Sequence, residues 1–195
     1  MNFSKLIKYK YVLASQSPRR KQLLKLLGID FEIFHPSILE NHSGEDPITY
    51  VKHLAKEKAK AAQEYFKEKI IIAADTIVVL KHKVLEKPSS QEEAKQMLAL
   101  LSGKTHIVYT AICVINLYNG KELVDYEKTK VTFKNLLPEE IDDYVQAGTC
   151  MDKAGAYGIQ EDIGAVFIER IDGCYYNVVG LPLHKLYTML IKVID

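Results

Sequence analysis

Apolar runs typical of strands alternate with segments of helical periodicity, and this order restricts the fold more than any other feature of the sequence. Residues 70–74 form a continuous apolar run, which fits a strand buried in a central sheet, and strand character resumes at 77–80. Further strands are expected at 11–14, 31–34, 106–117 and 123–133. Helices are expected at 18–28, 47–66, 90–101, 138–146 and from Pro182 onward. The alternation predicts an α/β or mixed α+β domain with a mixed sheet.

Local signals support several of these element ends. Ser17 and Asp46 each precede a proline, the arrangement of an N-cap followed by the first helical residue. Ser90 and Glu93 have the spacing of a capping box. Asn119-Gly120 predicts a hairpin between the two long strands.

Composition excludes several classes of protein. A chain of 195 residues with 48% apolar side chains has material for one core, so we expect a single domain over residues 1–195. A net charge of +1 provides no overall positive field for nucleic acid. No apolar stretch approaches the roughly 18 residues of a membrane span, and the first ten residues lack the apolar part of an export signal. The three widely spaced cysteines favour free thiols. We therefore expect a cytoplasmic protein that binds neither nucleic acid nor a membrane.

The segment Ser15-Gln16-Ser17-Pro18-Arg19-Arg20 combines hydroxyls and guanidinium groups at a helix start. Free N–H groups, the positive end of the helix and bidentate arginine donors all favour a phosphate there. The alternative is an ordinary N-cap followed by two surface arginines. The residues alone leave both interpretations open.

Asp75 interrupts an apolar strand pair, together with Thr76. An ionised carboxylate in such surroundings needs a cation or a donor, so Asp75 is a candidate metal ligand or base. Lys87, expected on the next strand, is a candidate partner. The alternative is an exposed turn that holds Asp75 in solvent.

A glycine-rich stretch at 152–160 forms another candidate site. Its small residues allow a ligand to approach the backbone, while Tyr157 offers a stacking face and Gln160 an amide that can read a base edge. A flexible loop with an incidental amide is the alternative. By contrast, Ser102-Gly103-Lys104-Thr105 fails as a P-loop, because Leu98 stands where the motif needs glycine and a helix precedes it, so we predict a helix stop and a turn.

Six segments occur in a fixed order from about residue 11 to residue 190: LASQSPRRKQLL, AADTIVV, LEKP, LSGKTHIVYTAI, MDKAGAYGIQ and VVGLPL. Together they resemble the Maf family of nucleoside triphosphate pyrophosphatases, and the form of the fifth segment resembles the branch that acts on dTTP and UTP. The resemblance implies an inosine-triphosphatase-like fold, with a central twisted mixed sheet flanked by helices and two lobes around an active-site cleft. It also implies a homodimer.

The implied reaction is hydrolysis of a pyrimidine nucleoside triphosphate between the α and β phosphates, giving the monophosphate and pyrophosphate. The expected substrates are dTTP and UTP, with CTP or modified pyrimidine nucleotides as further ones. A divalent cation, Mg²⁺ or Mn²⁺, is expected as cofactor. Two alternatives remain: a regulatory protein in septum formation or cell division, and a purine triphosphate pyrophosphatase of the inosine type.

The resemblance also implies roles for individual residues. Asp75 is expected to accept the proton of the attacking water or to bind the metal, and Glu40 to assist with the metal or the water. The residues expected to hold the phosphates are Ser15, Arg19, Lys58 and Lys87. The residues at the positions that select the pyrimidine base are Arg19, Thr76 and Gln160.

Lys58 is the residue for which spacing and resemblance disagree most. The helix expected at 47–66, with the residue that follows it, carries other lysines on what spacing predicts to be its solvated face, namely Lys52, Lys56, Lys60 and Lys67. By spacing alone Lys58 is one more of them. Only the match of LAKEKAKA to the family makes it a phosphate ligand.

Three positions depart from the family pattern. Ala74 replaces the usual glycine before Asp-Thr, Glu161 follows Gln160 where glycine is common, and Leu39 stands where a second acidic residue is frequent. Glu161 adds negative charge beside the base-reading loop. Glu45 or Asp46 is an alternative to Glu40.

Overall fold

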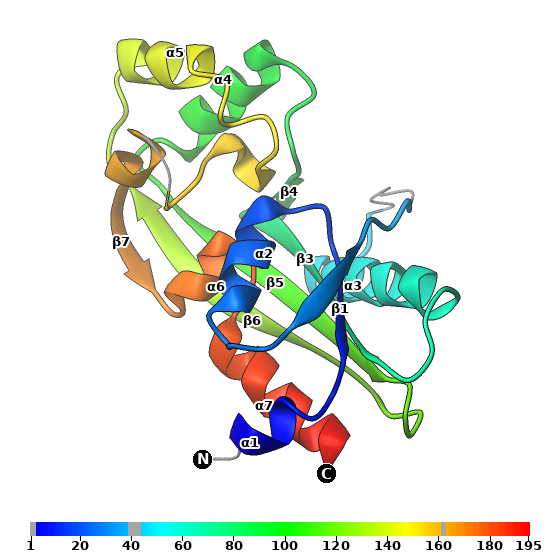
Figure 1. Ribbon diagram of the computed structural model, residues 1–195. Coiled ribbons are helices and arrows are strands. Elements are labelled where there is room, and N and C mark those ends of the chain that lie inside the picture. Colours follow the sequence, from blue (N-terminus) through cyan, green and yellow to red (C-terminus); the bar gives the residue numbers. More distant parts are fainter. Residues whose placement is uncertain (1–2, 39–43, 161–162) are drawn as a thin grey trace. The chain divides into compact units, whose positions relative to one another are not determined.

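The computed structural model describes residues 3–38, 44–160 and 163–195, and in this part of the chain helices flank a seven-stranded mixed sheet (Figure 1). The strands are β1 (Tyr11–Ala14), β2 (Phe31–Phe34), β3 (Ile70–Leu80), β4 (Lys83–Leu85), β5 (Thr105–Asn116), β6 (Glu122–Phe133) and β7 (Ile168–Asp172). Their order is β2-β1-β3-β5-β6-β7, and β4 pairs with β3. The predicted mixed α/β fold class is confirmed.

The helices are α1 (Phe3–Leu6), α2 (Pro18–Lys25), α3 (Pro47–Gln63), α4 (Gln91–Leu101), α5 (Pro138–Gln146), α6 (Tyr175–Val179) and α7 (Leu183–Ile194), with short 3-10 helices η1 (Ala154–Ala156) and η2 (Ile163–Phe167). The five helices predicted from the sequence are present, and α1 and α6 were not predicted. Within the described ranges, no helix is long and apolar enough to cross a membrane.

The chain divides into two compact units. Unit 1 contains Met1–Asp75, Thr110–Glu127 and Gly180–Asp195, and unit 2 contains Thr76–Tyr109 and Lys128–Val179. The strands β3, β5 and β6 contribute residues to both units. The single domain over residues 1–195 stays a prediction.

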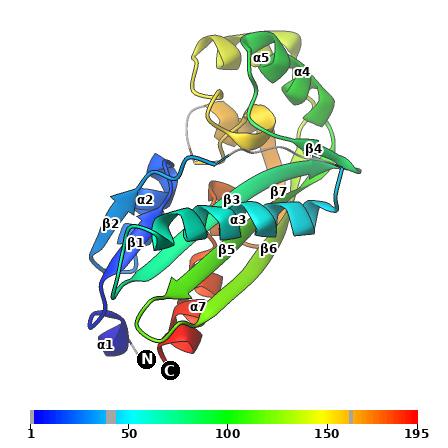
Figure 2. The ribbon, with the colours of Figure 1, turned by 90° about the vertical axis from the view of Figure 1, so that its right-hand side faces the viewer.

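Unit 1 is built on three parallel strands. β1 lies between β2 and β3, with Tyr11–Ala14 opposite Phe31–Phe34 on one side and Ile70–Ala73 on the other. The connection through α2 runs from β1 to β2, and the connection through α3 runs back past β1 to β3. Because such crossovers are right-handed, these opposite directions place α2 and α3 on opposite faces of the sheet. Figure 2 looks onto the face that α3 covers.

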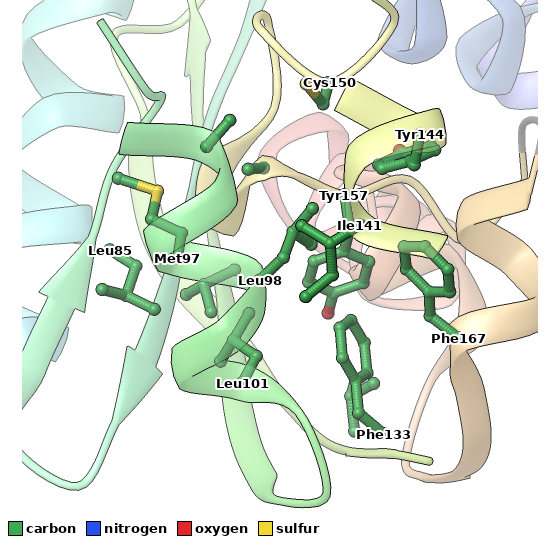
Figure 3. Packing of buried hydrophobic residues seen from close by; sticks show 14 of the residues in the cluster. Leu85, Met97, Leu98, Leu101, Phe133, Ile141, Tyr144, Cys150, Tyr157 and Phe167 are labelled. Carbon is green, nitrogen blue, oxygen red and sulfur yellow. The ribbon is translucent and has the colours of Figure 1, made fainter. Parts of the chain in front are cut away.

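Unit 2 has an apolar core of its own, formed by residues of α4, α5 and the strands together with Tyr157 and Phe167 (Figure 3). The Phe133 ring lies 4.7 Å from the Tyr157 ring and 6.2 Å from the Phe167 ring, centroid to centroid. Tyr144 packs edge-on against Phe167 at 5.1 Å. Such edge-to-face contacts hold these side chains in defined orientations.

Local capping signals are confirmed. Ser17 and Ser90 accept hydrogen bonds from the N–H groups of Arg20 and Glu93, and Asp46 accepts from two N–H groups of α3. The Glu93 carboxylate accepts from Ser89 rather than from the Ser90 N–H, so the predicted capping box forms only in part. At the other end of α4 the predicted stop is present, because Ser102 is the C-cap and Gly103 has a positive φ of 64°.

The predicted interruption of the central strand is wrong. β3 runs without a break from Ile70 to Leu80 and includes both Asp75 and Thr76. An acidic residue is tolerated inside this strand because Asp75 forms an ion pair with Lys58 of α3. The polar residues therefore mark a site along a strand and not a strand junction.

His106 is a buried titratable residue in unit 2, and it provides a test of the packing. Burial lowers the pKa of His106 from 6.5 to about 4. The unfolded chain therefore binds this proton more readily, so the contribution to stability is complete above about pH 6.5 and is lost as the pH falls toward 4. We expect urea denaturation to show a loss of about 3 kcal/mol across this window that is absent in His106→Phe. Equal pH slopes for the two proteins would contradict the buried neutral state.

Candidate active site

The carboxyl end of β1 is the place where the fold of unit 1 favours ligand binding. The chain leaves β1 in one direction toward β2 and returns on the other side as β3, so the strand order reverses at this strand. In open sheets of this kind, ligands bind beyond the carboxyl ends of the strands at such a reversal. Ala14 lies opposite Ala73, so Ser15 and Asp75 follow at neighbouring levels of the sheet.

The loop after β1 is organised by Ser15 and Arg20. The Ser15 hydroxyl accepts hydrogen bonds from the Ser17 N–H at 3.2 Å and from the Arg20 guanidinium at 3.4 Å. Arg20 Nε also donates to the Gly180 carbonyl at 2.9 Å. Ser17 is the N-cap of α2, as predicted. Arg20, however, is half-buried and hydrogen-bonded, and so it is not an ordinary surface arginine. It ties the start of α2 to the segment that precedes α7.

Arg19 lies half-buried in the first turn of α2, four residues after the buried Ser15. The turn offers N–H groups, the positive helix end and a guanidinium in one place, which favours an anion. The structure thus places two of the predicted phosphate ligands together at the end of β1.

Asp75 and Lys58 form a buried ion pair between β3 and α3. Lys58 is 7% exposed and Asp75 is 6% exposed, and the ammonium donates to Asp75 Oδ1. The alternative of an exposed turn around Asp75 is therefore wrong. The sequence suggested Lys87 as the partner of Asp75, but the partner observed in the described residues is Lys58. Spacing also misplaced Lys58, which lies on the covered face of α3 and not on a solvated one.

Two other lysines of α3 differ from the prediction of a solvated face. Lys52 lies over the Tyr126 ring with its ammonium 5.0 Å from the centroid, and Lys56 forms an ion pair with Glu122 at 2.6 Å. Both are half-buried, because the residues of β6 in unit 1 meet this part of the helix. Lys60 and Lys67 are exposed, as predicted.

The remaining predicted residues belong to unit 2 or lie outside the described ranges. Lys87 is exposed and follows the end of β4 by two residues, so it lies in a loop and not on the predicted strand. Thr76 follows Asp75 directly in β3, and neighbouring residues of a strand point to opposite faces. Gln160 is half-buried. Glu40, and with it Leu39 and Glu161, lies outside the described residues.

Tyr157 does not fit the predicted stacking role. It is 5% exposed, and its hydroxyl pairs with His106 Nε2 at 2.7 Å inside the core of unit 2. Its ring is covered by Phe133 and therefore cannot act as an open face for a base. Sequence reasoning missed His106. Residues Val108–Asn116 of β5 are buried without alternation, so no strand period of two distinguished this histidine.

The carboxylate of Asp75 limits how a metal can bind. In the ranges that the structure describes, no three His, Cys, Asp or Glu side chains lie close enough together to hold an ion. Mg²⁺ is commonly bound through one or two carboxylates together with the phosphates of a substrate. The buried Asp75 therefore fits a Mg²⁺ or Mn²⁺ that takes most of its ligands from a triphosphate and from water.

Comparison with known proteins agrees with these features. The family model described as "Maf-like protein" matches residues 10–193 of the chain. The chain belongs to the Maf-like protein family. All the site residues discussed above lie within the matched range, so they belong to the Maf-like part of the chain.

Curated relatives cover nearly the whole of this Maf-like chain. The dTTP/UTP pyrophosphatase of Syntrophomonas wolfei is 48% identical over 182 residues, which are 92% of this chain and 95% of the relative. The dTTP/UTP pyrophosphatase of Caldanaerobacter subterraneus is 50% identical over 182 residues, covering 93% of this chain and 87% of the relative. The dTTP/UTP pyrophosphatase of Clostridium perfringens is 48% identical over 184 residues, which are 93% of this chain and 95% of the relative.

Proposed function

We propose that this protein hydrolyses pyrimidine nucleoside triphosphates, dTTP and UTP first among them, to the nucleoside monophosphate and pyrophosphate. The observation that carries the proposal is the buried Lys58–Asp75 pair beside the phosphate-favouring loop after β1. Relatives of 48% to 50% identity that are named dTTP/UTP pyrophosphatases support the substrate class.

Binding of the triphosphate is assigned to the cationic groups. Ser15 and Arg19 would hold phosphate oxygens at the start of α2, where the helix end adds positive potential. Lys58 would supply a further positive charge next to Asp75. Lys87 is proposed as the fourth phosphate ligand. Together these groups offset the charge that develops on the leaving pyrophosphate.

The chemical step is a displacement at the α phosphorus. A water molecule attacks this phosphorus, the bond to the bridging oxygen of the β phosphate breaks, and pyrophosphate leaves. Asp75 would accept the proton of the attacking water, or would hold the cation, and Glu40 would assist. The cation, Mg²⁺ or Mn²⁺, withdraws charge from the phosphate oxygens when it is bound. The ion pair with Lys58 would hold Asp75 in position.

Base selection is assigned to Arg19, Thr76 and Gln160. The amide of Gln160 can donate and accept at the same time, which matches the edge of a pyrimidine. We also propose that the protein forms a single domain over residues 1–195 and acts as a cytoplasmic homodimer without binding nucleic acid. The free thiols of all three cysteines agree with a reducing compartment.

Pyrophosphate release from a panel of nucleotides tests the proposal. The panel is dTTP, UTP, CTP, GTP, ITP and 7-methyl-GTP, each with Mg²⁺ or Mn²⁺. We expect kcat/KM for dTTP and UTP to exceed the purine values by about tenfold or more, since one well-placed polar contact discriminates at this level. Preference for ITP would instead favour the alternative function, a purine triphosphate pyrophosphatase of the inosine type. Absence of turnover with every nucleotide would overturn the enzymatic function and leave the regulatory role.

A further inference from the structure

The loop that leads to Gln160 is held to unit 2 at three successive points. The Gly155 N–H donates to the carbonyl of Glu86, the residue before Lys87, at 3.1 Å. The Tyr157 hydroxyl and His106 Nε2 are 2.7 Å apart. The Gly158 N–H donates to the Tyr144 hydroxyl at 3.2 Å. The backbone is therefore fixed up to two residues before Gln160.

The conformation of this loop directs Tyr157 inward. Gly155 and Ala156 have positive φ angles of 70° and 61°, and a left-handed backbone is unusual for alanine. A Cβ at Gly155 would lie 3.0 Å from Val78 Cγ2, so the turn packs directly on β3. A residue keeps such a conformation only when its surroundings impose it. The bond between Tyr157 and His106 is one of the contacts that do so.

The chain also returns to the same place beyond Gln160. A Cβ at Gly164 would lie 2.7 Å from the Tyr144 hydroxyl and 2.8 Å from the Gly158 carbonyl oxygen. Gly164 thus lies close to Tyr144 and Gly158, which form one of the hydrogen bonds that hold the loop before Gln160. The chain therefore lies close to Tyr144 at Gly158, two residues before Gln160, and again at Gly164, four residues after it.

His106 has no role in the reaction described above. It is 1% exposed and is held edge-on by Phe133 at 5.0 Å and by Tyr157 at 5.3 Å. Its Nδ1 atom has no hydrogen-bond partner in the part of the chain that the structure describes. Two apolar side chains would fill this space without burying polar atoms. The hydrogen bond therefore serves to orient the His106 and Tyr157 side chains rather than to bury apolar surface.

We propose that His106 and Tyr157 are positioning residues for base selection, because their hydrogen bond fixes the backbone from which Gln160 reaches the pyrimidine. The inference rests on the proposed function, which assigns the base to Gln160. Neither His106 nor Tyr157 touches the substrate in this arrangement. A hydrogen bond weakens steeply when distance or angle departs from its optimum, so a small shift of the loop lowers base discrimination.

Tyr157→Phe tests this role because it removes only the hydroxyl. The measurement is kcat and KM for UTP and for GTP, with thermal unfolding of each protein alongside. We expect the ratio of kcat/KM for UTP to that for GTP to fall about fivefold to tenfold, the effect of losing roughly one hydrogen bond. The fall is expected through a higher KM for UTP, with kcat for UTP and kcat/KM for GTP nearly unchanged. His106→Phe, which breaks the bond from the other side, is expected to lower the ratio in the same way.

Tyr11→Phe is the matched control. The Tyr11 hydroxyl is also buried and donates to the Leu6 carbonyl at 2.8 Å, but in unit 1. This variant is expected to lose stability and keep the nucleotide ratio. An unchanged UTP-to-GTP ratio in Tyr157→Phe would overturn the positioning role, and so would an equal fall of the ratio in Tyr11→Phe. In either case, turnover of UTP by the native protein would still uphold the proposed function. A native protein without turnover would instead overturn the proposed function, and the positioning role with it.

Discussion

Asp75→Asn is expected to lower kcat for pyrophosphate release from UTP by about 10³-fold, within the range that a general base contributes. The amide has the shape of the carboxylate but cannot accept the proton of water, and because it is neutral it binds a divalent cation more weakly than the carboxylate does. It also removes the negative partner of Lys58. Steady-state turnover with UTP and Mg²⁺ measures the effect, and circular dichroism establishes that the variant is folded.

Asp125→Asn is the matched control for this prediction. Asp125 is also a carboxylate of unit 1, half-buried on β6, and it accepts from Lys185 at 3.1 Å. Burial acts to raise the pKa of Asp125, but hydrogen bonds from the Tyr126 N–H and Lys185 outweigh it and lower the pKa overall. We expect this variant to retain native kcat. If Asp75→Asn also kept kcat within about tenfold, Asp75 would be neither base nor metal ligand.

Lys58→Met is expected to be the most destabilising change at the candidate site. It leaves the Asp75 carboxylate buried without its cation, and breaking a buried pair in this way costs about 3 to 5 kcal/mol. For a chain of this size the loss corresponds to a fall in Tm of about 10 °C. Turnover is expected to fall as well, because Lys58 is a proposed phosphate ligand. Thermal unfolding and UTP hydrolysis of the same preparation measure both effects.

Two further variants separate stability from catalysis at this pair. Removing both charges, in Lys58→Met with Asp75→Asn, is expected to restore much of the stability but none of the turnover, since no buried charge remains unpaired. Lys56→Met removes a lysine two positions away on α3 whose partner Glu122 is at the surface, and it is expected to change Tm little. An equal fall in Tm for Lys56→Met and Lys58→Met would contradict the prediction that the buried pair contributes more to stability than the surface pair.

Much of the fold followed from short-range patterns. The N-caps at Ser17, Asp46 and Ser90 each depend on atoms within four residues, so the side chain and the N–H that it binds are visible together in the sequence. The hairpin at Asn119-Gly120 is equally local, with the Gly120 N–H donating to the Asn116 carbonyl at 2.8 Å. Periods of two and 3.6 residues located the strands and helices for the same reason.

The residue types of the candidate site were also recognisable from the sequence. The loop from Ser15 to Arg19 combined a helix start with anion-binding groups, and Asp75 stood out as a charge within an apolar run. Parallel pairing of β1 with β3 brings these two segments to one place in unit 1. The sequence indicated the chemistry of each segment, and the register of the sheet decided that they are neighbours.

Partners distant in the sequence were decided only by the tertiary structure. Lys58 and Asp75 are 17 residues apart, and periodicity along α3 assigned Lys58 to solvent because it carries no information about which strand covers that face. His106 and Tyr157 are 51 residues apart, so a tyrosine that resembled an open stacking face became a buried hydrogen-bonding group. Local sequence determines backbone conformation and the chemistry available, whereas burial and pairing depend on which elements pack together, and here they set the charge partner of Asp75 and the anchor of the loop before Gln160.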